Sequence, residues 1–192
     1  MVFGPMSGKT MPGGDALGWP LADVGVRLID ARGAEADEGE LWMLTPANML
    51  GYLNLPEKTR QVLTEDGWYK SGDVFRRDAD GCYYFVGRVD DMFNCGGENV
   101  YPGEVEKVIE RMPEVMQACV VPIADDIKGQ KPVAFVVLRG GANLSERTIK
   151  DFVLAHAPAY QHPRRVFFMD TLPLAATNKI DRATLRRAAE AS

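Results

Sequence analysis

Three segments of the sequence carry side chains that could do chemistry, and the first of them is Trp68–Asp73. It brings two aromatic residues, a lysine, a glycine and the carboxylate of Asp73 together. A fixed aspartate can accept hydrogen bonds from both hydroxyl groups of a ribose, as acidic residues do in dinucleotide sites. Any strand that ends in a turn could have the same composition, so this segment alone gives only a candidate nucleotide contact.

The second segment is Gly87–Glu106, with the sequence GRVDDMFNCGGENVYPGEVE. Arg88 supplies a forked cation that is always charged, and the adjacent Asp90 and Asp91 are typical of a turn. Two consecutive glycines, Gly96 and Gly97, allow the backbone to pass within contact distance of a ligand or another chain. A hairpin followed by a helix would explain the glycines but not the whole string.

The third segment is Leu172–Arg182, where Lys179 is the single charged residue of an otherwise uncharged loop that ends at Ile180. A lone lysine on a loop usually faces solvent and does nothing more. The functional alternative is a mobile point charge that is delivered to an oxygen of a phosphate or a carboxylate.

Two other candidate sites fail on spacing. The segment Gly4–Thr10, GPMSGKT, has three residues between its glycines where a phosphate-binding loop needs four. The only histidines, His156 and His162, have Pro158 between them and cannot share one helix face for a metal. The sequence therefore predicts no metal site.

Composition and charge limit the class of protein. The chain has 192 residues, of which 46% are apolar and 26% charged, as in ordinary globular proteins with one domain or two small ones. The 22 basic and 27 acidic residues give a net charge of -5, which argues against a nucleic-acid partner. Residues 1–87 hold 8 basic and 13 acidic residues, while residues 88–192 hold 14 of each, so we expect a boundary near residue 87.

The cysteines and the apolar runs indicate the compartment. Cys82, Cys95 and Cys119 are odd in number and widely spaced, so we predict reduced thiols and no disulfide framework. No apolar run approaches the ~20 residues that a bilayer requires, and the start of the chain does not look like a signal peptide. We expect a cytoplasmic protein without a membrane contact.

The predicted elements place these segments in an α+β fold with two parts. Residues 21–87 are predicted to be mostly β, with one or two helical turns in Pro56–Thr64. After Gly97, apolar residues at helical spacing predict a helix that starts at Pro102. Two more helices are predicted, with a three-stranded sheet between the helices; the helices follow the caps Ser145 and Asp181, and the strands are Val115–Ile123, Pro132–Leu138 and Val166–Met169.

Taken in order, four segments resemble successive motifs of the adenylate-forming superfamily: Gly39–Leu53, Trp68–Asp73, Gly87–Glu106 and Pro173–Arg182. That family includes acyl- and aryl-CoA synthetases, adenylation domains of nonribosomal peptide synthesis and firefly luciferase. Family members also have a Ser/Thr/Gly-rich phosphate loop and a YGxTE-like motif further upstream, and neither is found here. The resemblance therefore implies the carboxy-terminal part of such an enzyme, whether as a truncation, a proteolytic fragment or a natural short relative.

In that part, residues 1–89 would be the carboxy-terminal β-rich subdomain of the large adenylating domain, and residues 90–192 a small mobile lid. The resemblance implies that Asp73 accepts hydrogen bonds from the ribose of AMP and that Arg88 supports the same nucleotide. It places Asp90 at the hinge about which the lid rotates. The missing upstream portion of the same enzyme would be the main partner of the chain.

Two further residues take roles from the resemblance. Gly97 falls where the family passes the pantetheine arm of CoA along the backbone. Lys179 matches the lysine that bridges the attacking carboxylate and the α-phosphate during adenylation. The motif commonly has glycine before that lysine, and Asn178 stands there instead; asparagine tolerates the left-handed backbone that such a position needs.

The implied activity is the ATP-dependent ligation of a fatty or aromatic carboxylic acid to CoA, with ATP and Mg²⁺, through an acyl-adenylate. The loop GGENVYP resembles that of acyl- and aryl-CoA synthetases more than that of peptide-synthesis domains. We expect the chain by itself to be inactive. Two alternatives stay open: the acceptor could be a carrier protein in place of CoA, or the chain could be a non-catalytic module that binds a nucleotide or a partner protein.

Overall fold

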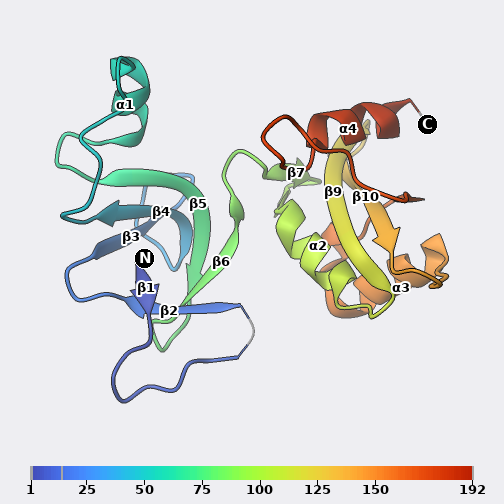
Figure 1. Ribbon diagram of the computed structural model, residues 1–192, viewed down its shortest axis with the longest axis horizontal. Helices are drawn as coiled ribbons and strands as arrows, with labels where there is room; N and C mark the ends of the chain where they lie inside the picture. The colour runs from blue at the N-terminus through green and yellow to red at the C-terminus, as the bar shows by residue number, and fades with distance from the viewer. Residues whose placement is uncertain (1, 14, 192) are drawn as a thin grey trace. The chain divides into compact units, whose positions relative to one another are not determined.

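The computed structural model describes residues 2–13 and 15–191, which form two compact units; the first ends at Asp90 and the second begins at Asp91 (Figure 1). Strands dominate the first unit, and helices cover a smaller sheet in the second. The predicted α+β fold class is confirmed.

An antiparallel six-stranded sheet forms most of the first unit, in the order β1-β2-β6-β5-β4-β3. Its interior is an apolar cluster in which the rings of Phe3 and Tyr83 stack with centroids 4.8 Å apart. One short helix, α1 (Pro56–Val62), has no buried residue. The strands are β1 (Phe3–Gly4), β2 (Ala16–Pro20), β3 (Gly25–Ile29), β4 (Glu38–Leu44), β5 (Tyr69–Arg77) and β6 (Tyr83–Arg88).

The second unit contains the three predicted strands and, in addition, the short hairpin of β7 (Phe93–Cys95) and β8 (Glu98–Val100). The long strands β9 and β10 pair antiparallel, β11 pairs parallel with β10, and β7 meets β10 where Cys95 lies opposite Gly129. The remaining elements are β9 (Val115–Asp125), β10 (Gly129–Leu138), β11 (Val166–Phe168), α2 (Pro102–Glu110), α3 (Glu146–His156), η1 (Ala159–Gln161) and α4 (Arg182–Glu190).

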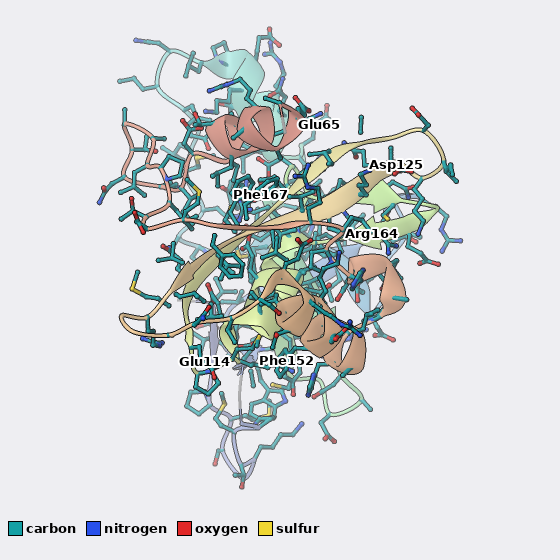
Figure 2. The ribbon with its side chains drawn as sticks, turned by 90° about the vertical axis from the view of Figure 1, so that its right-hand side faces the viewer. Glu65, Glu114, Asp125, Phe152, Arg164 and Phe167 are labelled. Carbon is teal, nitrogen blue, oxygen red and sulfur yellow. The ribbon has the colours of Figure 1, made fainter. Side chains whose placement is uncertain are left out.

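The sheet of the second unit is buried on both faces. Because side chains alternate along a strand, Val120 of β9 and Val136 of β10 face one cluster, while Val121 and Phe135 face another. The first cluster is covered by α2 and α3, and the second by α4. Figure 2 shows this division, with Phe152 on the side of α3 and Phe167 on the side of α4.

The helices of the second unit begin where the sequence predicts. Pro102 opens α2, where its missing N–H costs nothing. The hydroxyl of Ser145 accepts from the Thr148 N–H at 3.1 Å, and the carboxylate of Asp181 accepts from the Thr184 N–H at 3.0 Å. These caps fix the residue at which each chain segment turns into a helix.

Other features of the structure concern the cysteines, membrane-spanning helices, metal-binding groups and the GKT segment. All three cysteines are free thiols and buried. Among the described residues, no helix is long and apolar enough to cross a membrane, and no group of three His, Cys, Asp or Glu residues could hold a metal ion. Lys9 of the GKT segment donates to the carbonyl of Asp80 at 2.6 Å and lies over the ring of Trp19, so its ammonium is engaged within the fold.

Candidate functional site

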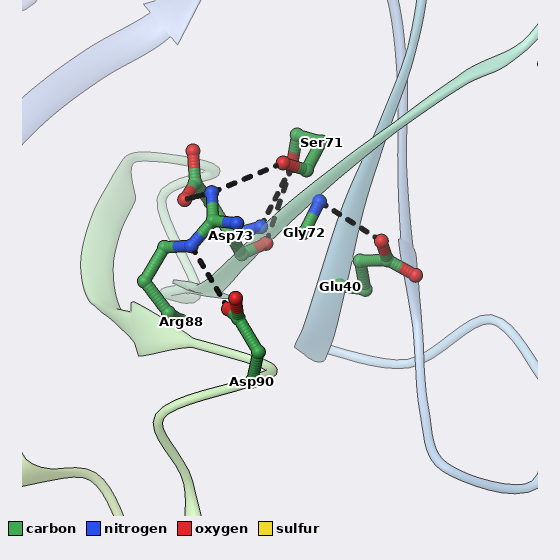
Figure 3. A network of polar contacts seen from close by, with 6 residues as sticks. All are labelled: Glu40, Ser71, Gly72, Asp73, Arg88 and Asp90. Carbon is green, nitrogen blue, oxygen red and sulfur yellow. Dashed lines mark hydrogen bonds and ion pairs between the residues drawn. The ribbon is translucent and has the colours of Figure 1, made fainter. Parts of the chain in front are cut away.

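The candidate nucleotide contact is built where β5 and β6 pair. Asp73 and Arg88 lie directly opposite each other in this pair, and Nη1 of Arg88 donates to Oδ1 of Asp73 at 2.7 Å. Nη1 also donates to the carbonyl of Ser71 at 3.3 Å, and Nε donates to Oδ1 of Asp90 at 3.1 Å (Figure 3). The hydrogen bond with Asp73, and then that with Asp90, raise the pKa of Arg88 above its ordinary value. Arg88 therefore joins the expected ribose contact to the expected hinge residue.

The carboxylate of Asp73 is only partly used. Arg88 occupies Oδ1, and the structure gives Oδ2 no donor among residues 2–13 and 15–191. The side chain is 34% exposed, so a ligand can reach it. A half-used, accessible carboxylate held by a fixed cation is suited to accept hydrogen bonds from hydroxyl groups of a ligand.

Strand β5 is irregular just before Asp73, where its register with β4 shifts, and this local turn of the backbone depends on a glycine and a glutamate. Gly72 has a φ of +70°, and a Cβ there would lie 3.0 Å from Nη2 of Arg88. The N–H of Gly72 donates to Oε1 of Glu40 at 2.9 Å, while Oε2 of Glu40 accepts from Nε1 of Trp42 at 3.0 Å. Figure 3 shows Glu40 on the neighbouring strand reaching this turn. Oε1 of Glu40 thus holds the backbone next to Asp73, and the bond from Trp42 to Oε2 orients the carboxylate.

Sequence reasoning named the motif that contains Glu40 but gave Glu40 no role. A signal was present: Glu40 and Trp42 are two residues apart, so in a strand they share one face. Tyr69 was also missed, although it precedes Asp73 by four residues on β5. Burial raises the pKa of Tyr69, and a hydrogen bond with Tyr52 adds to the effect. The phenol therefore stays protonated near the site at neutral pH.

The double glycine forms the turn of the β7–β8 hairpin. Gly96 and Gly97 have φ values of +65° and +95°, a backbone region that residues other than glycine rarely adopt. The N–H of Gly96 donates to the carbonyl of Lys128 at 2.9 Å, and that of Gly97 donates to Oδ1 of Asn94 at 2.9 Å. A Cβ on Gly97 would meet nothing within 4 Å. Glycine is therefore needed here for its backbone angle, and the space beside it is open.

Lys179 lies on a tight hairpin that precedes α4. Leu174 and Ile180 form a bridge, the N–H of Ala175 donates to the carbonyl of Lys179 at 2.7 Å, and the N–H of Asn178 donates to the carbonyl of Ala175 at 2.9 Å. Asn178 has a φ of +61°, the left-handed backbone expected for it. Lys179 is exposed, and within the described part of the chain its ammonium has no hydrogen bond or ion pair. This charge is free to meet a ligand.

The structure thus brings Asp73, Arg88 and Asp90 into one network of the first unit, and it carries Gly97 and Lys179 on separate hairpins of the second. The two histidines do not meet at a metal site: Nδ1 of His156 contacts the carbonyl of Phe152, and Nδ1 of His162 accepts from Arg164. In the first unit, the carboxylate of Asp73 suits the binding of hydroxyl groups; in the second, the exposed ammonium of Lys179 suits the stabilisation of phosphate charge.

Comparison with known proteins identifies a matching family and relatives of this chain. The family described as AMP-binding enzyme C-terminal domain matches residues 104–179. The chain is 40% identical over 154 residues to 4-coumarate--CoA ligase-like 6 of Oryza sativa subsp. japonica, which covers 80% of the chain and 26% of that protein. It is 37% identical over 182 residues to Fatty acid--[acyl-carrier-protein] ligase ScoC of Streptomyces coeruleorubidus, which covers 92% of the chain and 35% of that protein.

A solved structure shows the same fold. The chain superposes on the anthranilate CoA ligase AuaEII in complex with anthranoyl-AMP with a TM-score of 0.83 and 34% identity, over 98% of the chain and 38% of that protein. The chain spans about a third of the length of the relatives it matches, and the match is to their carboxy-terminal part.

Proposed function

The chain belongs to the adenylate-forming superfamily, as the carboxy-terminal part of one of its members, and we propose that this member is an ATP-dependent ligase that joins a fatty or aromatic acid to CoA. In the first step, a carboxylate oxygen attacks the α-phosphorus of ATP, and pyrophosphate leaves. In the second step, the sulfur of CoA attacks the acyl carbon, and AMP leaves. The reduced cysteines agree with a reaction in the cytoplasm.

The observation that carries the proposal is the half-used carboxylate of Asp73 next to Arg88. Its free Oδ2 would accept hydrogen bonds from the ribose hydroxyls of ATP and of the acyl-adenylate. Arg88 would keep the carboxylate oriented while the nucleotide binds. Glu40 would support both by fixing the turn at Gly72.

We assign residues 1–89 to the β-rich end of the large adenylating domain and residues 90–192 to a lid that turns about Asp90. Support comes from the turn at residues 89–91, which joins the two compact units. Limited proteolysis tests the hinge: cleavage should concentrate at residues 88–92. Resistance there, with cleavage elsewhere, would argue against a mobile connection.

The two hairpins of the second unit would act in different steps. Lys179 would place its ammonium between the attacking carboxylate and the α-phosphate, where negative charge develops during adenylation. Gly97 would lie along the pantetheine arm of CoA during thioester formation, and the open space beside it leaves room for that arm. Mg²⁺ would enter with ATP, bound to its phosphates as part of the substrate.

The chain by itself should not complete the first step, because the relatives are about three times as long and the phosphate-loop motif of the family is absent from the 192 residues. Acid-dependent release of pyrophosphate by the purified chain, above a buffer control, would contradict this expectation.

A carrier protein is the alternative acceptor, and the similarity to the acyl-carrier-protein ligase ScoC supports keeping it. The test is an assay of the complete enzyme with ATP and a panel of fatty and aromatic acids, with CoA or a phosphopantetheinylated carrier protein as acceptor. Thioester with CoA supports the proposal, and thioester with the carrier alone supports the alternative. The absence of any acyl-adenylate would reject both.

A further inference from the structure

An arginine–carboxylate pair also lies inside the second unit. Arg182, the first residue of α4, donates Nη1 to Oε1 of Glu106 at 2.7 Å and Nη2 to Oε2 at 3.1 Å. The same Nη1 donates to the carbonyl of Val120 at 2.8 Å, and Sγ of Cys119 lies 3.3 Å away. A two-pronged contact of this kind fixes both distance and orientation.

The pair sits on the edge of the sheet. Strand β9 pairs with β10 on one side, and within the described residues no strand pairs with its other side. On that open edge, Oε1 of Glu106 accepts from the N–H of Val120 at 2.7 Å, and Glu110, one turn later, accepts from the N–H of Ala118 at 2.9 Å. Arg182 covers the same edge by donating a hydrogen bond to the carbonyl of Val120. Helix α2, α4 and β9 are therefore joined at one point.

Helix α2 and the lysine hairpin, Leu174–Ile180, depend on the contact between Arg182 and Glu106 to different degrees. Helix α2 is anchored by its own apolar residues, with Val105 and Ile109 fully buried. The lysine hairpin has little apolar anchorage, because Leu174 is 58% exposed and Ile180 is only partly buried. Arg182 is three residues from Lys179, directly after Asp181, whose N–H donates to the carbonyl of Pro173 at 2.8 Å. Arg182 is thus the residue that ties this end of the hairpin to α2 and β9.

We propose that Arg182, held by Glu106, is the positioning residue for Lys179: it fixes the end of the hairpin from which the lysine reaches the α-phosphate. This inference rests on the proposed function for the role of Lys179, but the anchoring itself does not. Because Glu106 belongs to the helix that directly follows the β7–β8 hairpin, the same contact keeps Lys179 and Gly97 in one rigid frame.

The anchoring is tested in the 192-residue chain by amide hydrogen exchange. Arg182→Lys keeps the charge and removes the fork, so that the fold is retained while the two-pronged contact is lost. We expect exchange at Ala175 and Asn178, whose N–H groups close the lysine hairpin, to become at least ~10-fold faster, with no change at Val153 in α3. The control is Arg186→Lys, which alters an exposed pair with Glu190 on the same helix and should leave the hairpin unchanged. Unchanged exchange in Arg182→Lys would overturn the inference.

The consequence for catalysis is tested in the complete enzyme by timing the half-reactions separately. Arg182→Lys should lower the rate constant of acyl-adenylate formation ~10-fold at an unchanged KM for ATP, and Glu106→Gln should do the same. Thioester formation from supplied acyl-adenylate should stay within about twofold. Equal losses in both steps would reveal general destabilisation and overturn the positioning role. A wild-type enzyme that forms no acyl-adenylate would reject the proposed function, and hydrogen exchange would then decide the anchoring alone.

Discussion

The Arg88–Asp73 pair of the first unit and the Arg182–Glu106 pair of the second have the same shortest contact of 2.7 Å and very different surroundings. Asp73 is 34% exposed, and one of its oxygens has no donor in the described part of the chain, whereas Glu106 is 13% exposed and both its oxygens are engaged. Arg88 donates to the carbonyl of Ser71 in addition to its carboxylates and is 43% exposed, while Arg182 donates to the carbonyl of Val120 at a strand edge and is 32% exposed. The number of unused hydrogen-bonding positions, and not the length of the ion pair, separates a pair that can take a ligand from a pair that holds the fold.

The largest effect should come from breaking the pair of Arg182 and Glu106, called the filled pair because both carboxylate oxygens are engaged. Glu106→Gln leaves the guanidinium of Arg182 without its counter-charge in a largely buried place, so the free energy of unfolding of the second unit should fall by about 3 kcal/mol. Asp73→Asn, at the accessible pair, should cost less than about 1 kcal/mol. Urea unfolding of the 192-residue chain measures both. Similar losses in the two variants would remove the distinction drawn between the pairs.

The ammonium of Lys179, which has no hydrogen bond or ion pair within residues 2–13 and 15–191, is the extreme case of an unused group. In the complete enzyme, Lys179→Ala should slow acyl-adenylate formation by at least ~100-fold, the scale of one lost transition-state contact. Formation of thioester from supplied acyl-adenylate should change far less, since the lysine would act in the first step only. Lys179→Arg should recover part of the first step. A loss shared equally by both steps would show that the role assigned to this lysine is wrong.

The accessible pair should show itself in nucleotide binding. Asp73→Asn removes the ionised acceptor for the ribose hydroxyls, so the KM for ATP should rise about tenfold. The matched control is Asp37→Asn, because Asp37 also pairs with an arginine of β5, Arg77, at 2.7 Å. That control should leave the KM for ATP unchanged. The measurement is the ATP dependence of pyrophosphate release, and equal effects of the two substitutions would contradict a specific ribose contact.

The smallest effect concerns the thiol of Cys119, whose Sγ lies 3.3 Å from Nη1 of Arg182. Burial, first of all, raises the pKa of Cys119 from 9.0 to about 12, so the folded chain keeps this proton at pH values where the unfolded chain has lost it. The contribution to stability is therefore complete below pH 9 and declines as the pH rises towards 12. Relative to Cys119→Ser, which does not titrate, the wild-type chain should lose about 1 kcal/mol between pH 8 and pH 10. Parallel curves for the two proteins across this range would show that Cys119 titrates normally.

Local signals in the sequence were enough for some elements. The helices after Pro102, Ser145 and Asp181 begin as predicted, because capping depends on residues within one turn. Strand β5 lies within the region predicted to be mostly β, but its bounds were not predicted, since Lys70, Ser71, Gly72 and Asp73 interrupt the alternation of apolar residues. Its polar stretch is stabilised from outside, by a contact between Gly72 and Glu40 over 32 residues.

Long-range contacts also explain what sequence reasoning could not find in the site. The residue types of Asp73, Arg88, Gly97 and Lys179 and their order along the chain were visible, and their roles stay proposals. The pair of Arg182 and Glu106 spans 76 residues, and no periodicity connects the two positions. The contact between Arg182 and Glu106 becomes apparent only in the folded chain, where α4 and α2 meet at strand β9.

The covered edge of β9 has a consequence for the behaviour of this chain in solution. An open strand edge is a template on which a second molecule can add its own strand, and sheets then grow from one chain to the next. Here the carboxylates of Glu106 and Glu110 occupy the N–H groups of Val120 and Ala118, and Arg182 occupies the carbonyl of Val120. An incoming strand would have to displace charged partners to gain neutral ones. The same residues that hold the second unit together therefore disfavour the addition of a second molecule at this edge.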